Sequence, residues 1–178
     1  MDALNRYDRW LHVRVMNPLF AWIQKLFHWN RFQLIRGFLL AETVTSLVAA
    51  GLFAAAAVVT SSDIVIAPVV LSASMFLPGL LGVYIYREIR PDLKKASDDF
   101  KAGRSIRWSL KNIPLVKGRD RWRSAFSLVG TISFVFLAFM AAVPGLPTAG
   151  RMGFAVMAAF TLCEVVESHL LWEDDLQS

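Results

Sequence analysis

The sequence predicts an all-α membrane protein: a four-transmembrane-helix bundle of two hairpins, with an N-terminal interfacial amphipathic helix and a basic cytoplasmic loop. Hydrophobic residues make up 56% of the 178 residues and the mean hydropathy is +0.47, which is more apolar than a soluble domain of this size usually is. The 19 Lys and Arg residues lie almost wholly in two blocks, separated by long uncharged windows. Such segregation of charge is typical of membrane-spanning chains.

Residues 37–86 are expected to form the first transmembrane hairpin. Two apolar windows, 37–59 and 64–86, each hold about 23 residues, enough for a helix to cross the ~30 Å hydrocarbon layer. The polar residues 60–63 separate the two windows, and Pro68 follows soon after them. Because proline disrupts a helix interior, this break disfavours one very long buried helix.

Residues 124–172 are expected to form the second transmembrane hairpin. The window 124–143 is uncharged, and the Pro-Gly-Leu-Pro turn that begins at Pro144 closes it. The fourth window begins at Met152, but its purely apolar part ends at Cys163, about 12 residues later, a length that a re-entrant or interfacial helix would also have. We expect this segment to cross the membrane.

The basic residues predict the orientation of the chain. Residues 1–36 hold six Lys or Arg residues, and residues 87–123 hold twelve against five acidic residues. Short loops rich in Lys and Arg stay on the cytoplasmic side. The sequence therefore predicts a multi-pass membrane protein with both termini cytoplasmic, including an acidic tail at residues 173–178. The frequent use of Ala, Val and Gly favours a bacterial inner membrane.

The N-terminal segment, residues 1–36, is expected to lie in the headgroup plane of the membrane. Asn17 and Pro18 are typical of a helix start, and aromatic residues alternate with basic residues on both sides of them. Helices of this composition usually lie in the interface, although a docking surface for a partner protein would have the same residues. The candidate lipid or partner surface of this segment is Trp10, Arg14, Trp22, Lys25 and Trp29.

The middle segment, residues 87–123, is expected to be a basic cytoplasmic loop with a formal net charge of +7. A short amphipathic helix is expected after Pro91, ending at Gly103. Basic residues beside a membrane attract anionic lipid, but the same charge also serves simply as the topology signal. Nucleic-acid binding is not expected, because the segment contains no recognition module. The candidate residues for lipid or partner contacts are Arg87, Arg90, Lys94, Lys95, Arg104, Arg107 and Trp108.

Four polar residues are candidates for an intramembrane cluster: Glu42, Glu164, Glu167 and His169. Glu42 lies inside the first apolar window, where a carboxylate is costly and usually faces a partner or a pathway. The predicted topology brings the end of the fourth window to a comparable depth. The cluster is a candidate for relaying protons or binding a cation; alternatively, Glu42 pairs with an arginine and the other residues lie in interfacial water.

Motifs for catalysis and for cofactors are missing from the sequence. A carboxylate-bridged metal bundle needs Glu-x-x-His pairs, and haem needs histidines inside the spans. The chain has three histidines, of which two precede the first window, and it has no G-x-S-x-G elbow or phosphate loop. We therefore predict no catalytic residue, no metal, no cofactor and no specific small-molecule ligand.

These features predict a non-catalytic accessory or structural subunit of a larger membrane complex. Its cytoplasmic face is expected to contact anionic membrane lipids and other membrane protein subunits. The alternative is a small ion- or proton-coupled transporter component that uses Glu42 as its carrier. A lipid-modifying enzyme is a third hypothesis, but no nucleophile or metal motif supports it.

Overall fold

The computed structural model describes the backbone of residues 2–59, 66–103 and 119–170, and these residues form helices without any strand. Four of the helices are long and apolar enough to cross a membrane. Their bounds are α3 Arg31–Val59, α4 Ile66–Lys101, α6 Arg119–Ala142 and α7 Thr148–Leu170. The predicted all-helical class and the four apolar spans are thus confirmed.

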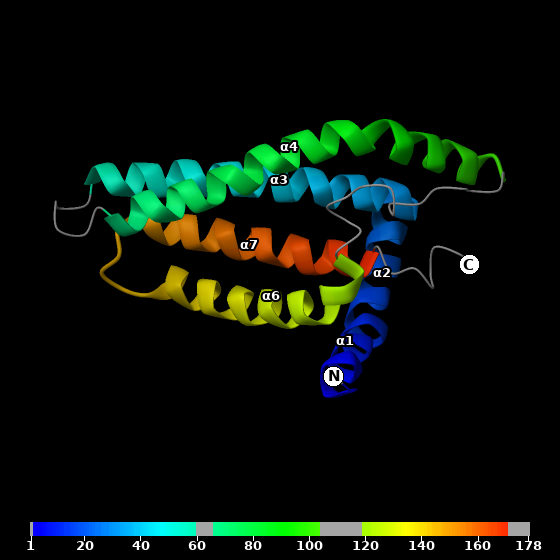
Figure 1. Cartoon of the computed structure of the whole chain (residues 1–178), viewed down its shortest axis with the longest axis horizontal. Helices are drawn as coiled ribbons and strands as arrows, with labels where there is room; N and C mark the ends of the chain where they lie inside the picture. The colour runs from blue at the N-terminus through cyan, green and yellow to red at the C-terminus, as the bar shows by residue number, and fades with distance from the viewer. Residues whose placement is uncertain (1, 60–65, 104–118, 171–178) are drawn as a thin grey trace.

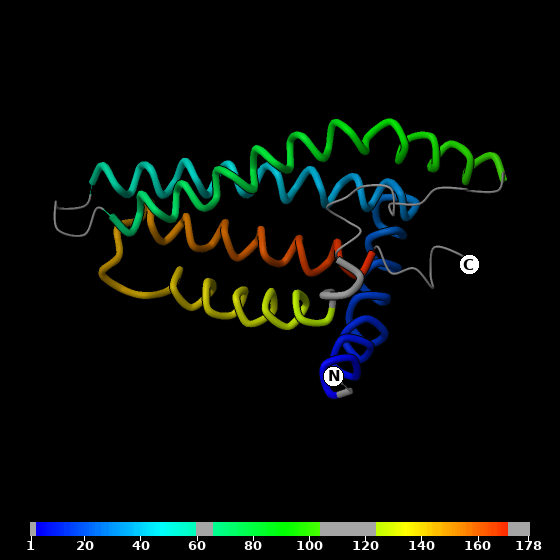
Figure 2. The backbone as a smooth tube through the Cα atoms, in the orientation of Figure 1, coloured from blue at the N-terminus to red at the C-terminus, as the bar shows by residue number. Residues whose placement is uncertain are grey.

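The four long helices pack one on the next in the order α4, α3, α7, α6, and α4 crosses α3 in the view of Figure 1. Within the described residues, α4 packs extensively only on α3, and the long helix against α6 is α7. Successive helices run in opposite directions along the chain (Figure 2). The apolar windows of α4 and α6 are only 11% buried, against 33% for α3 and 39% for α7. The two edge helices therefore present most of their apolar surface to their surroundings.

Small residues bring α3 and α4 close together in the middle of their crossing. Ser46 donates a hydrogen bond to the Met75 carbonyl (2.5 Å), and Ser72 donates one back to the Ala50 carbonyl (2.8 Å). These bonds cross between helices in an apolar layer, where each hydroxyl needs a partner. A β-carbon added to Gly82 would lie 2.5 Å from the Thr43 hydroxyl, so any larger residue here would force Thr43 or the helices to move.

The N-terminal helices form one continuous run: α1 Asp2–Leu11, the π-helical turn η1 His12–Met16, and α2 Asn17–Phe27. As the sequence predicts, α2 begins at Asn17 with Pro18 in its first turn, but η1 precedes it without a break. In η1 the Asn17 N–H bonds to the His12 carbonyl, five residues earlier, as is typical of a π-helical turn. Pro18, which has no N–H to donate, then lies in the first turn of α2, where a missing N–H is tolerated. The run ends at His28, which adopts the left-handed conformation with φ 52°.

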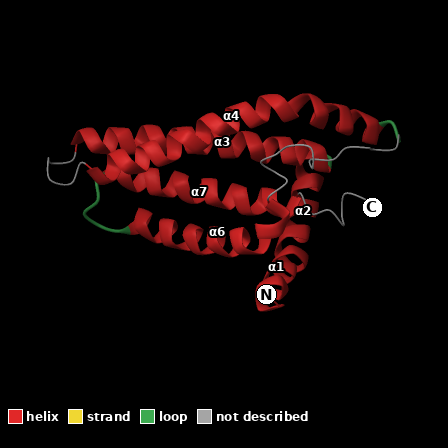
Figure 3. Ribbon diagram, viewed as in Figure 1, coloured by secondary structure: helices red, strands yellow, loops and turns green. Residues whose placement is uncertain are grey.

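This N-terminal run lies crosswise at one end of the helical row (Figure 3). The start of α3 and the end of α7 lie at this same end, where Arg31 Nε donates a hydrogen bond to the Leu170 carbonyl at 3.0 Å. The largest core cluster of the protein lies here and joins the N-terminal run to the row. Its buried members are Leu11, Met16, Phe20, Phe32, Leu34, Ile35, Leu39, Ile89, Leu93, Ala96, Val165, Val166 and Leu170.

Helix α4 continues far beyond the expected end of the second span at residue 86. It runs through Pro91 to Lys101, so the first part of the expected basic loop is helical. Proline removes one helical hydrogen bond, and this loss is offset because Ile89 and Leu93 are buried in the core. Ser97 accepts a hydrogen bond from the Asn30 side chain at 2.8 Å, which fixes the extension against the start of α3.

Candidate functional site

Four buried polar side chains, Asp8, His12, Ser127 and His169, meet at the end of the helical row. We call them the polar junction. Their exposed fractions are 1%, 4%, 0% and 0%. Burying ionisable groups in an apolar protein is costly unless they interact with one another, so this concentration at one contact is the most distinctive site among the described residues.

Local helix geometry places these residues on facing surfaces. Asp8 and His12 are four residues apart, which puts them on one face of the N-terminal run. On α6, Ser124, Ser127 and Thr131 follow at spacings of three and four and also share a face. The N-terminal run thus turns a polar stripe toward a polar stripe of α6, and His169 from α7 enters between them.

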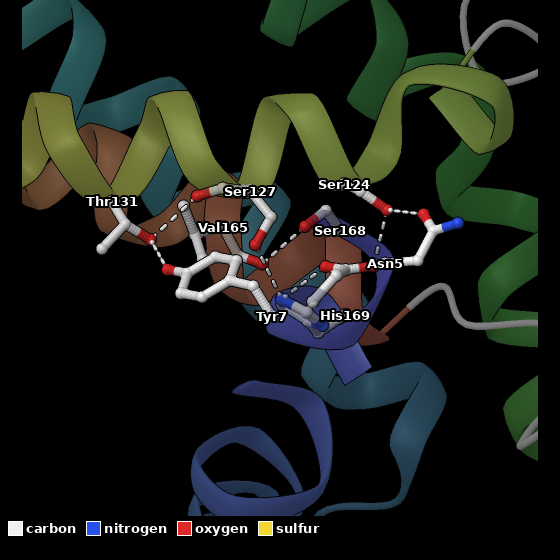
Figure 4. Close-up of polar contacts among 9 residues, drawn as sticks. Asn5, Tyr7, Ser124, Ser127, Thr131, Val165, Ser168 and His169 are labelled. Carbon is white, nitrogen blue, oxygen red and sulfur yellow. Dashed lines mark hydrogen bonds and ion pairs between the residues drawn. The ribbon is translucent and has the colours of Figure 1, made fainter. Parts of the chain in front are cut away.

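His169 is the centre of the junction (Figure 4). Its Nε2 atom lies 3.2 Å from Ser127 Oγ and 3.6 Å from Asp8 Oδ1. The His12 ring stacks on the His169 ring, with 5.5 Å between the ring centroids and 23° between the ring planes. His169 therefore contacts a serine, a carboxylate and a second imidazole.

Further hydrogen bonds fasten α1 to α6 on both sides of His169 (Figure 4). Ser124 Oγ lies 3.2 Å from Asp8 Oδ2 and 3.1 Å from Asn5 Oδ1. Tyr7 donates its phenolic proton to Thr131 Oγ1 at 3.1 Å. The junction is therefore a specific contact that sets the position of the N-terminal run on the row.

The junction does not have the geometry of a nucleophilic relay. In such a relay the base bonds the nucleophile through one ring nitrogen and the orienting carboxylate through the other. Here Ser127 and Asp8 both face Nε2 of His169. A metal centre is also absent from the described part of the chain, where no three His, Cys, Asp or Glu side chains are placed to hold an ion.

Three members of the predicted intramembrane cluster lie near one another. Glu42, Glu164 and Glu167 are all within electrostatic range of the Cys163 thiol. One carboxylate oxygen of Glu42 and one of Glu167 are shielded from solvent. His169, the fourth member, contacts Ser127 and Asp8 in the polar junction.

The predicted lipid or partner surface is exposed wherever the structure describes it. On the N-terminal run, Trp10 is 56% exposed and Trp22 is 60% exposed, with Arg14, Lys25 and Trp29 exposed beside them. The basic residues on the extension of α4 are exposed as well, namely Arg87, Arg90, Lys94 and Lys95. Arg104, Arg107 and Trp108 lie outside the described residues.

Sequence reasoning did not single out Asp8, His12 and Ser127 as site residues. The spacing of Asp8 and His12 is a usable signal, because a carboxylate and an imidazole four residues apart lie on one helix face. That spacing does not reveal that His169 packs against these two residues, since His169 lies far along the chain.

Comparison of the chain with protein-family models, with curated proteins and with solved structures found no match.

Proposed function

We propose that the protein is a non-catalytic subunit of a larger membrane assembly, in which the N-terminal run forms a membrane-surface platform for lipids and partner subunits. One observation carries this proposal: a helical run lies crosswise at one end of four membrane-length helices and exposes large aromatic side chains. When helices α3, α4, α6 and α7 cross the bilayer as two hairpins, a crosswise run at their end lies in the membrane plane.

The exposed side chains of the N-terminal run suit the headgroup region. Trp10, Trp22 and Phe27 are each more than half exposed, and Arg9, Arg14 and Lys25 are exposed on the same run. Aromatic residues with Lys and Arg are typical of helices that lie at the interface. Each basic residue near an anionic surface adds roughly 1 kcal/mol of attraction.

The basic residues also support a cytoplasmic position for this end of the protein. The exposed basic residues of the α4 extension lie at the same end of the row as the N-terminal run. Segments rich in Lys and Arg beside the spans stay in the cytoplasm, and the platform then faces the anionic leaflet of an inner membrane.

The open packing order of the helices favours a subunit over a self-contained carrier. A carrier encloses its substrate between helices, whereas here the edge helices α4 and α6 pack on one long neighbour each. Their outward faces carry large exposed apolar residues such as Leu77 and Phe139. Such open edges in a membrane are filled by lipid or by neighbouring subunits.

A second candidate function, proton coupling, is favoured by the carboxylates of Glu42, Glu164 and Glu167 around Cys163. Ionisable residues at membrane depth often relay protons. In this case Glu42 is the carrier and the two glutamates of α7 assist it.

Purification of the tagged full chain from native membranes in mild detergent tests the first proposal. We expect the wild-type protein to co-elute with at least one other membrane protein in a fixed ratio. Combining Trp22→Ser with Phe27→Ser is expected to lower recovery of that partner by about tenfold, because aromatic anchors dominate the energy of interfaces. Leu162→Ser is the control on the central helix α7, where the side chain is also exposed, and it should leave recovery unchanged.

Two results would contradict the subunit proposal. One is a wild-type chain that elutes alone as a single species. The other is a Glu42→Gln variant that loses proton uptake in proteoliposomes but recovers the partner normally, which favours proton coupling. If the wild type shows no proton uptake and Glu42→Gln loses the partner, the subunit proposal is favoured.

A further inference from the structure

The part of α4 beyond residue 86 carries its basic and acidic residues on opposite flanks. Each residue turns an α-helix by about 100°, so positions can be compared with Leu93, which is buried in the same core cluster as the start of α3. One flank, about 60–120° from Leu93 in the direction of the helical turn, carries three exposed basic residues: Arg90, Lys94 and Arg87. The opposite flank, about 100–140° the other way, carries three acidic residues: Glu88, Asp92 and Asp99.

Two contacts show which part of α3 lies beside the basic flank. Asn30 Nδ2 donates a hydrogen bond to Ser97 Oγ at 2.8 Å. Farther along α3, the Thr43 hydroxyl would be 2.5 Å from a β-carbon added to Gly82. Because the two helices are antiparallel, Arg36, which is midway between Asn30 and Thr43, lies level with about residue 90 of α4. A third exposed arginine is therefore level with the basic flank.

Arg36 also lies on the same side of the α3–α4 pair as the basic flank. It precedes Thr43 by almost two full turns, which places it about 20° from Thr43 toward the exposed side of α3, where Leu40 lies. Helix α7 packs on the other flank of α3, where Phe53 lies against Gly153. In an antiparallel pair, flanks reached by turning the same way from the contact lie on the same side. Arg36 and the basic flank of α4 thus share the side of α3 that faces away from α7.

We call Arg36, Arg87, Arg90 and Lys94 the basic rim. All four side chains are exposed. Glu42, the acidic residue of α3, lies toward α7, near the Cys163 thiol. Asp98 lies near the basic flank of α4, but about 12 Å farther along the helix than Arg90. The three arginines therefore concentrate positive charge at the end of the rim that is nearer the apolar windows.

The basic rim lies at the boundary of both apolar windows of the first hairpin. Arg36 immediately precedes the window 37–59, and Arg87 immediately follows the window 64–86. When these windows fill the hydrocarbon layer, the rim lies at the level of the lipid headgroups. On the same side of α3, Leu40 and Val44 continue from the rim into the apolar window, and both side chains are exposed.

We infer that the basic rim binds the phosphate of an anionic phospholipid, whose acyl chains lie along the exposed side of α3. This inference rests on the proposed position of this end of the protein at the membrane surface. Arg36 and Arg90 come from different helices at one level, so a phosphate between them offsets the repulsion of their charges. Arginine also binds phosphate through two parallel hydrogen bonds. The exposed Leu40 and Val44 favour a lipid over a soluble phosphate, because acyl chains cover apolar surface.

Native mass spectrometry of the tagged full chain tests the lipid site. The protein is purified in mild detergent and mixed with equal amounts of phosphatidylglycerol and phosphatidylcholine. We expect the wild type to retain phosphatidylglycerol in preference. Arg36→Gln combined with Arg90→Gln should lower this preference by about tenfold, because basic residues near the surface supply the attraction for an anionic headgroup.

Two double variants and one competitor are the controls. Arg6→Gln with Lys95→Gln removes the same charge from exposed positions outside the rim, and it should leave the preference unchanged. Arg36→Lys with Arg90→Lys keeps both charges and should retain the preference, since lysine binds phosphate as a point charge. Glycerol 3-phosphate, which has the phosphate but no acyl chains, should not displace the retained lipid.

Three outcomes would overturn the lipid site. The wild type retains the two lipids equally; the variants outside the rim lower the preference as much as the glutamine variants of Arg36 and Arg90; or glycerol 3-phosphate displaces the lipid, which would assign the rim to soluble phosphates. Recovery of the partner protein is measured on the same samples. A wild type that lacks the lipid preference but still co-elutes with its partner contradicts the lipid site alone and leaves the subunit proposal intact.

Discussion

Replacing Gly82 by Val is expected to lower the free energy of unfolding by about 2–3 kcal/mol, because the added methyl groups force α3 and α4 apart. A β-carbon at this position would lie 2.5 Å from Thr43 Oγ1 and 3.5 Å from the Thr43 α-carbon. Thr43 cannot easily turn away, since its buried hydroxyl donates to the Leu39 carbonyl at 2.8 Å. Unfolding in mixed detergent micelles, followed by circular dichroism, measures the loss.

Gly51→Val is the matched control for this prediction. It makes the same substitution in a membrane-length helix, but no atom lies within 4 Å of an added β-carbon at Gly51. Its effect should stay within about 0.5 kcal/mol of zero, as for most changes at open surface positions. Equal losses for the two variants would mean that close packing of α3 on α4 is not what stabilises this pair.

Replacing Asp8 by Asn is expected to weaken the docking of the N-terminal run by about 1–3 kcal/mol. The amide keeps the size of the side chain and one acceptor for Ser124, but it removes the charge that faces His169 at 3.6 Å. Removing one member of a buried polar group leaves the other without compensation. Amide hydrogen exchange in α1 should accelerate roughly ten- to a hundredfold, because exchange reports local opening.

Asp98→Asn is the control for the Asp8 variant. Asp98 is exposed on the extension of α4, so the same loss of one charge should leave exchange in α1 unchanged. If Asp8→Asn also left exchange in α1 unchanged, the polar junction would make no measurable contribution to docking.

The four spans are predictable from sequence because lipid imposes a strong and local constraint. A chain in hydrocarbon must satisfy its own backbone hydrogen bonds, and about 20 apolar residues of helix do so. The windows that end at Val59 and Val143 end within one residue of the ends of α3 and α6. No knowledge of the neighbouring helices is needed for this step.

The extensions of the spans are not predictable in the same way. Helix α4 passes Pro91 because Ile89 and Leu93 are buried against other elements, and a sequence window contains no record of those contacts. The start of α3 at Arg31 depends similarly on Leu34 and Ile35, which are fully buried in the same core. Tertiary packing here outweighs the local signal of proline.

The candidate site shows the same division. The carboxylates of Glu42 and Glu167 were recognisable because charge at membrane depth is rare. Asp8 and His12 were not, since a charged residue in an amphipathic segment ordinarily faces water. His169 was recognisable from its position on α7, but its contacts with His12 and Asp8 were not, because they join segments far apart in the sequence.

The depth of the N-terminal run in the membrane tests the central claim most directly. Spin labels at Trp10→Cys and Trp22→Cys, each with Cys163→Ala, report depth through their relaxation by oxygen and by a water-soluble nickel complex. The two positions are about 18 Å apart along the helix, and both are exposed. For a run that lies in the membrane plane, both labels should lie at headgroup depth and differ by less than the helix diameter of about 10 Å. Depths that differ by the full length along the helix, or two labels in bulk water, would contradict the account.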